Sequence, residues 1–204
     1  MGDKNFISSA KDYIFYCAVV ISKQVCVKIY QVFFPPYVNQ IEVLKANLLI
    51  DIGHRFLGGL LLFLGAIQFE SKIRIHAPKF PRISGYLYIG LAYCISFTAA
   101  YIAIFTPYGG FPESVGVVSI SFIYAACITF SLKNALIKKY SLHREWMIRG
   151  YAIASFIYVI RIFSNVFYHL GATASGPEIF LASSNIAFVI NYIIAEWWIT
   201  RTRA

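Results

Sequence analysis

Five apolar runs of about 20 residues dominate the chain, at 49–69, 84–106, 115–136, 146–169 and 178–199. A run of this length, wound as an α-helix, crosses the hydrocarbon core of a bilayer. The whole chain has the same character, since 59% of its 204 residues are hydrophobic and only 13% are charged. In lipid the backbone must satisfy its own hydrogen bonds. We therefore expect an all-α integral membrane protein, a bundle of five transmembrane helices.

The segment 12–34 predicts a sixth helix with two alternative positions. It is apolar, but Lys23 and Lys28 would each cost about 2.5–3.5 kcal/mol at the bilayer centre. The helix either crosses the membrane with its polar side against protein or lies amphipathically on the surface. We favour the crossing helix. The chain then divides into an N-terminal helix and outer loop, 1–48, and a five-helix membrane domain, 49–204.

Basic residues alternate between the connections. The loops 70–82 and 138–145 carry Lys and Arg, as does the C-terminal RTRA, whereas 106–114 and 171–178 carry none. Because Lys and Arg stay on the cytoplasmic side during insertion, the basic loops and the C-terminus should face the cytoplasm or the mitochondrial matrix. We expect the bacterial cytoplasmic membrane or the mitochondrial inner membrane. The net charge of +9 is then a signal of topology, and we expect no nucleic-acid partner.

The four histidines fall at two depths. His54 and His169 lie near the outer ends of their spans, and His76 and His143 lie in the inner loops. Paired neutral imidazoles from different helices are the ligands of a transmembrane haem b. His54 and His169 are thus candidate ligands of a haem iron, and His143 and His76, together with Arg149, form a secondary candidate set on the inner side. Interfacial roles for all four stay open, because an imidazole ring is comfortable at headgroup depth.

Arg161 lies deep inside an apolar run, 15 residues after Trp146. At a rise of about 1.5 Å per residue it is about 22 Å from the inner interface. A charge at this depth needs a partner. Asp51 precedes His54 by three residues and shares its helix face, so we expect a cluster of Asp51, His54 and Arg161. The cluster either ties two helices together or holds a haem propionate, a quinone carbonyl or a lipid phosphate.

Other side chains have simpler interpretations. Glu196 lies near the inner end of the last span, where we expect it to pair with Arg149 or to lie at the interface. Trp146 and the pair at 197–198 fit an interfacial aromatic belt. The cysteines stand singly inside apolar runs and predict small buried residues, with no disulfide or zinc site. They are Cys17, Cys26, Cys94 and Cys127.

Three stretches together resemble one family: HRFLGGLLLFLGAIQFESKIR, PRISGYLYIG and HREWMIRGYAIASFIYVIRIF. They are similar to the polytopic membrane proteins grouped as domain of unknown function family 2306, over residues 50–170. The family name implies no activity. Pro81 stands where the family has a histidine, which leaves a four-histidine cofactor scheme incomplete. The matching positions are His54, Gln68, Arg82, Gly85, His143, Arg144, Trp146, Met147, Arg149, Ala152 and Arg161.

Motifs of soluble enzymes are missing from the sequence, including G-x-S-x-G, the P-loop and H-E-x-x-H. The short loops leave no domain for soluble substrates. We therefore expect a non-catalytic accessory subunit of a larger energy-transducing membrane complex, in contact with other membrane subunits, the lipid bilayer and bound phospholipid. One alternative is a haem b protein that passes electrons across the membrane, as a quinol or ferric reductase does. The other is a small transporter or lipid-binding protein that uses the buried charges.

Overall fold

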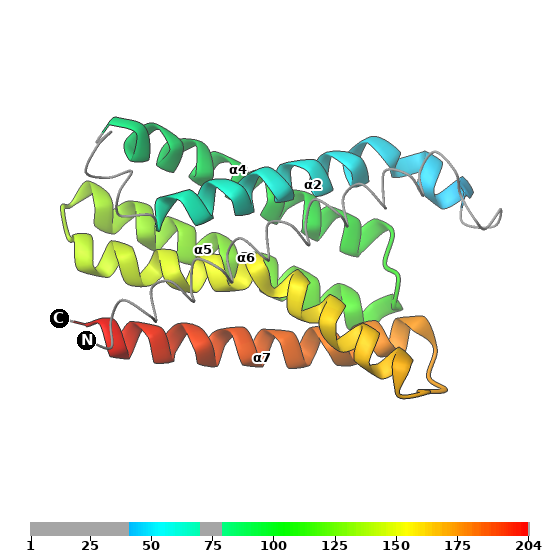
Figure 1. The fold of residues 1–204 in the computed structure, drawn as a ribbon. Coiled ribbons are helices and arrows are strands. Elements are labelled where there is room, and N and C mark those ends of the chain that lie inside the picture. Colours follow the sequence, from blue (N-terminus) through cyan, green and yellow to red (C-terminus); the bar gives the residue numbers. More distant parts are fainter. Residues whose placement is uncertain (1–40, 70–78, 204) are drawn as a thin grey trace. The chain divides into compact units, whose positions relative to one another are not determined.

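A computed structural model describes residues 41–69 and 79–203, and over these ranges it contains five α-helices and no strands. Each helix includes a stretch long and apolar enough to cross a membrane. The prediction of an all-α membrane protein with five spans is confirmed. The segment 1–48 lies mostly outside the described residues, so the sixth helix and the domain division stay predictions. The helices are α2 (Ile41–Gln68), α4 (Lys79–Phe105), α5 (Gly110–Leu136), α6 (Tyr140–His169) and α7 (Gly176–Thr202) (Figure 1).

The helices begin earlier than the apolar runs do. The run predicted at 84–106 belongs to a helix that begins at Lys79, and the run at 146–169 to one that begins at Tyr140. The first turns of both helices carry charged side chains, which a search for apolar residues leaves out. The backbone bonds of a helix do not depend on the polarity of its side chains, so the helix continues from the bilayer into the headgroup region.

The chain divides into two compact units, Met1–Gly85 and Tyr86–Ala204. In the first unit a side-chain amide joins the end of α2 to the first turns of α4. Nε2 of Gln68 donates to Oγ of Ser84 at 2.6 Å and to the carbonyl oxygen of Pro81 at 3.2 Å. The hydrogen bonds of the Gln68 side chain therefore join the end of α2 to the beginning of α4.

α6 is the central helix of the second unit. It packs against both α5 and α7, which make few contacts with each other (Figure 1). α5 and α6 approach closely at Gly150, where an added Cβ atom would stand 3.1 Å from Cδ1 of Ile128. Between α6 and α7, a buried apolar cluster contains Ile148, Ala195 and Ile199. Small residues at such contacts let helices gain van der Waals attraction, which drives their association in lipid.

Hydroxyl groups connect the second-unit part of α4 to α5. The hydroxyl of Tyr93 and Oγ1 of Thr129 lie 2.8 Å apart. The hydroxyls of Tyr88 and Tyr124, two buried residues, lie 3.4 Å apart. Water is scarce in a bilayer, so polar side chains at this depth bond to each other or to the backbone.

Local backbone features close the turn between α6 and α7. Gly171 has φ of 72°, and its N–H donates to the carbonyl of Tyr168 at 3.1 Å. The N–H of Ala172 donates to the carbonyl of Phe167 at 3.1 Å, which completes a Schellman motif. α7 then begins after Ser175, whose N–H and hydroxyl both donate to the carboxylate of Glu178 at 2.8 Å. These bonds end α6 and begin α7, so the turn between the two helices is short.

Candidate functional site

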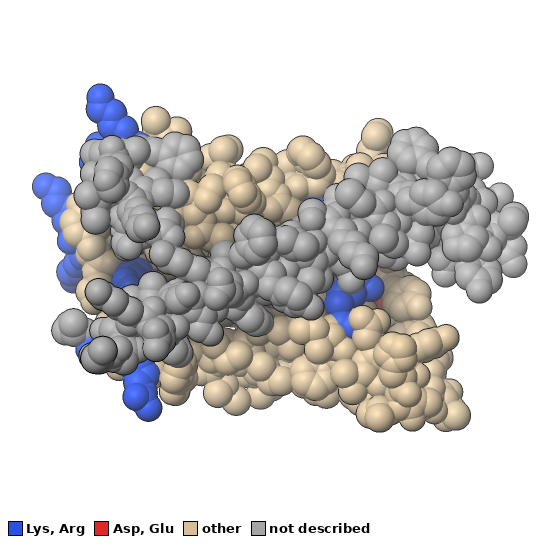
Figure 2. Space-filling view, in the orientation of Figure 1, with Lys and Arg blue, Asp and Glu red and all other residues tan. Residues whose placement is uncertain are grey.

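Lys and Arg side chains gather at the end of the second unit where α5 turns into α6 and α7 ends (Figure 2). They include Lys138, Lys139, Arg144, Arg201 and Arg203. The connections at the opposite end, 106–109 and 170–175, contain no Lys or Arg. We call the end that carries these Lys and Arg side chains the basic end. The loops that carry Lys and Arg in the sequence therefore lie at one end of the folded second unit, and the connections without them lie at the other.

From the basic end inward, four charged residues form an ion-pair chain that joins α6 to α7 and its C-terminal residue: Arg203, Glu145, Arg149 and Glu196. Arg149 donates Nε to Oε1 of Glu196 at 2.6 Å and Nη2 to Oε2 at 3.1 Å. Glu145 lies 3.7 Å from Arg149 and accepts two bonds from Arg203, at 2.9 and 2.8 Å. These bonds raise the pKa of the Arg203 guanidinium above its ordinary value, because the carboxylate favours the charged form. The predicted pairing of Glu196 with Arg149 is confirmed.

Arg149 also contacts an aromatic ring. Its guanidinium carbon lies 4.9 Å from the ring centroid of Trp146, a cation–π distance. The ring of Trp146 packs in turn against Phe130, with 4.9 Å between centroids. Arg149 is nine residues into α6, or about 14 Å along the helix axis. Trp146 therefore covers one face of a charged group that lies within a helix long and apolar enough to cross a membrane.

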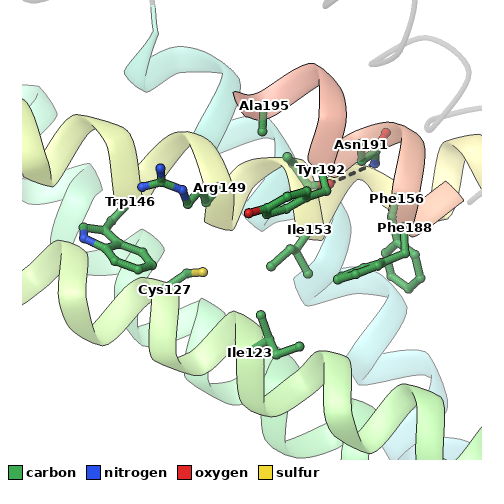
Figure 3. A pocket seen from close by; sticks show the side chains of 11 residues that line it. Ile123, Cys127, Trp146, Arg149, Ile153, Phe156, Phe188, Asn191, Tyr192 and Ala195 are labelled. Carbon is green, nitrogen blue, oxygen red and sulfur yellow. Dashed lines mark hydrogen bonds between the residues drawn. The ribbon is translucent and has the colours of Figure 1, made fainter. Parts of the chain in front are cut away.

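A cavity of about 310 Å³ lies beside Arg149 and is bounded by α5, α6 and α7 (Figure 3). Its polar lining is sparse and comes from Arg149, Asn191, Tyr192 and Cys127. Nδ2 of Asn191 donates to the carbonyl of Ala152 at 2.9 Å, a bond that spans α7 and α6. The rest of the lining is apolar or aromatic: Ile123, Trp146, Ala152, Ile153, Phe156, Phe188 and Ala195.

Among the residues that the structure describes, the cavity opens at the side of the second unit. Two of its lining residues, Ile123 on α5 and Tyr192 on α7, are 45% and 53% exposed. Cys127, deeper on α5, is only 4% exposed. The two exposed side chains border a mostly apolar interior that has Arg149 at one end.

The residues of the predicted outer cluster belong to different units. Asp51 and His54 lie on α2 of the first unit, and Arg161 and His169 lie on α6 of the second. Within α2, Asp51 pairs with Arg55 one turn later, at 3.0 and 2.8 Å. The exposed His169 is the last residue of α6. The association of Asp51 and His54 with Arg161, and haem ligation by the two histidines, stay predictions.

The inner histidines have separate outcomes. Nδ1 of His143 lies 2.8 Å from Oγ of Ser131 and 3.0 Å from the carbonyl oxygen of the same residue. This contact joins the start of α6 to the end of α5, a structural role. His76 lies outside the described residues, so the secondary haem pair stays a prediction.

Sequence reasoning missed the cavity. Cys127 is buried as expected, but it lines the cavity; Cys94 is exposed, and Cys17 and Cys26 lie outside the described residues. A signal was present in the spacing. Lining residues follow the helical repeat, at 146, 149, 152, 153 and 156 on α6 and at 188, 191, 192 and 195 on α7. That spacing marks one face of a helix, but it does not show which faces meet.

Five long apolar helices, a balanced ion-pair chain inside the basic end and an apolar cavity define a polytopic integral membrane protein. A family model described as predicted membrane protein (DUF2306) matches residues 52–199. The chain belongs to this family, as its residues led us to expect. No curated protein and no solved structure matches it.

Proposed function

We propose that the protein binds a lipid-soluble molecule in the cavity between α5, α6 and α7. The observation that carries the proposal is the cavity itself, apolar, open at its side and provided with a few fixed polar groups. Ligand sites have this composition and volumes of about 300–1,000 Å³. A molecule that enters sideways between membrane-spanning helices must first dissolve in the bilayer.

The cavity has a polar end and an apolar end. Arg149 and Trp146 lie toward the basic end of α6, whereas Phe156 lies seven residues further along the helix, about 10 Å deeper. On α7, Phe188 lies at the depth of Phe156, beyond Tyr192. An amphiphile would place its polar part near Arg149 and its apolar part between the two phenylalanines.

This function belongs to the third class expected from the sequence, a lipid-binding membrane protein. The roles of accessory subunit in an energy-transducing complex and of haem b protein stay predictions, and a subunit of such a complex could itself hold the lipophile. We propose that the basic end faces the cytoplasm or the mitochondrial matrix, in the bacterial cytoplasmic or mitochondrial inner membrane.

A bulky side chain at the cavity border tests the proposal. Ile123→Trp adds an indole at a half-exposed lining position without displacing a buried residue. The matched control is Phe122→Trp, at a neighbouring α5 position that is 72% exposed and does not line the cavity. Each protein is purified in mild detergent, extracted with organic solvent and analysed by mass spectrometry for the lipophiles it retains.

Wild type and the Phe122 variant should retain one class of lipophile in a constant molar ratio. The Ile123 variant should retain at least about fivefold less, which corresponds to about 1 kcal/mol of lost affinity. Equal retention in all three proteins, with the composition of the bulk membrane, would contradict the proposal. Identical gel-filtration profiles serve to show that the variants are folded alike.

A further inference from the structure

We infer that the cavity takes an uncharged lipophile with a carbonyl-bearing ring, of the quinone type, in preference to a phosphate-bearing lipid. The inference rests on the proposed function, since it names the class of molecule that the cavity binds. Three observations carry it: the charge balance beside the cavity, the hydrogen-bond donors at its polar end and the aromatic side chains of its wall.

The ion-pair chain beside the cavity is already neutral. It contains two guanidinium groups and two carboxylates, and Glu196 accepts two hydrogen bonds from Arg149. A phosphate at this point would face Glu196 and Glu145 in a medium of low dielectric. It would have to separate Arg149 from Glu196 or add an uncompensated charge, and both are costly inside a membrane. An uncharged molecule leaves the chain of ion pairs intact.

The polar end of the cavity supplies donors for a carbonyl oxygen. A carbonyl oxygen only accepts hydrogen bonds, whereas a guanidinium has five N–H groups and a phenol has one O–H. Arg149 donates Nε and Nη2 to Glu196, and its Nη1 lies 3.7 Å from Glu145, beyond hydrogen-bond distance, so N–H groups on its two terminal nitrogens remain for an acceptor. In Figure 3 the hydroxyl of Tyr192 points toward the end of the cavity where Arg149 lies.

The wall of the cavity suits a flat ring. Trp146 and Phe156 come from α6, and Phe188 and Tyr192 from α7. Aromatic rings attract one another in offset or edge-to-face arrangements. A volume of about 310 Å³ is near the lower limit for ligand sites, which accommodates a ring headgroup and the start of a tail. The rest of the tail can leave past Ile123 into the bilayer.

Cys127 provides the test, because it lines the cavity and is otherwise buried. The variant Cys17→Ser/Cys26→Ser/Cys94→Ser keeps Cys127 as its one thiol. The full chain is purified in neutral detergent, and the rate of alkylation by N-ethylmaleimide is measured by intact mass. Three probes are added separately: a fully substituted short-chain benzoquinone, a short-chain phosphatidic acid and a short-chain diacylglycerol. Full substitution leaves the quinone no ring carbon to which the thiol can add.

The benzoquinone should slow alkylation by about fivefold when present at about four times its Kd, since about 80% of the sites are then occupied. The two lipids should leave the rate unchanged. Protection by the quinone should disappear in the added Ile123→Trp variant and persist with Phe122→Trp. If Cys127 proves unreactive, Trp146 fluorescence in a Trp197→Phe/Trp198→Phe variant replaces it, and the quinone must quench saturably and more than it quenches free indole.

The outcomes separate the two proposals. Protection by phosphatidic acid or diacylglycerol in place of the quinone would overturn the ligand class and leave lipophile binding in place. A quinone without effect on either reporter would also overturn the ligand class. Lipophile binding itself is overturned by the retention experiment, if wild type, the Ile123 variant and the Phe122 variant all retain the same extractable lipids in the composition of the bulk membrane.

Discussion

Arg149 carries a full charge inside a membrane-spanning helix, and its partners come from two helices. Glu145 lies one turn before it on α6, Glu196 faces it from α7, and the ring of Trp146 lies beneath it. Four residues apart on one helix is a pairing that sequence spacing predicts. The pairing with Glu196 was predicted from depth in the membrane, and the bonds from Arg203 to Glu145 were not. Residues 58 positions apart meet there only because α6 and α7 are antiparallel neighbours.

Glu196→Leu should destabilise the folded protein by about 2–3 kcal/mol, because it leaves Arg149 with one carboxylate partner in a membrane-spanning helix. The double variant Arg149→Leu/Glu196→Leu should be destabilised less than the single one, since no uncompensated charge remains at this position. Unfolding in increasing denaturing detergent measures both. Lys139→Leu, at the exposed start of α6, is the control and should change stability little. A double variant less stable than Glu196→Leu would contradict the account.

α6 and α7 are joined by a turn whose geometry depends on one glycine. Gly171 lies in the left-handed region, with φ of 72°, where its N–H helps to end α6. The sequence predicted a connection at 171–178, and the turn lies there, although α7 already begins at Gly176. The helix starts were predicted late because apolar content marks the bilayer and not the ends of backbone hydrogen bonding.

Two glycine-to-alanine changes should act in opposite directions. Gly171→Ala places a Cβ atom at a positive φ and should cost about 1 kcal/mol. Gly116→Ala, inside α5, should stabilise by about 0.5 kcal/mol, because alanine favours the helix. A Cβ atom meets nothing within 4 Å at either position, so the backbone alone decides the sign. The unfolding midpoint in denaturing detergent checks both, and effects of the same sign would refute the backbone argument.

The second unit has one basic end and one end whose connections lack Lys and Arg. The sequence alone predicts this asymmetry, because Lys and Arg occupy alternate loops and alternate loops lie at the same end of a helical bundle. The arrangement of the cavity does not follow from the loops. The cavity forms because α6 lies between α5 and α7. Side chains from all three helices therefore line it.

The orientation can be measured with single cysteines. In a background without the natural cysteines, Lys139→Cys marks the basic end and Ala172→Cys the opposite end, and both positions are exposed. In spheroplasts of an expressing bacterium, a membrane-impermeant maleimide should label the cysteine at 172 at once. It should label the cysteine at 139 only after permeabilisation, because basic loops stay in the cytoplasm. The reverse order of labelling would place the basic end outside.

The amino-acid sequence by itself determined the number of described spans, the charged end and the family, because each depends on residues close together along the chain. The thickness of the bilayer sets the length of an apolar run, and the Lys and Arg residues of each loop determine its side of the membrane during insertion. Only the tertiary structure decided the ion-pair chain and the cavity. Both depend on which faces of α5, α6 and α7 meet, and Gly150, Asn191 and Ala195 show that small residues and cross-helix hydrogen bonds set those contacts. In lipid these weak packing forces replace the hydrophobic effect, so the apolar pattern that predicts a span does not predict its neighbour.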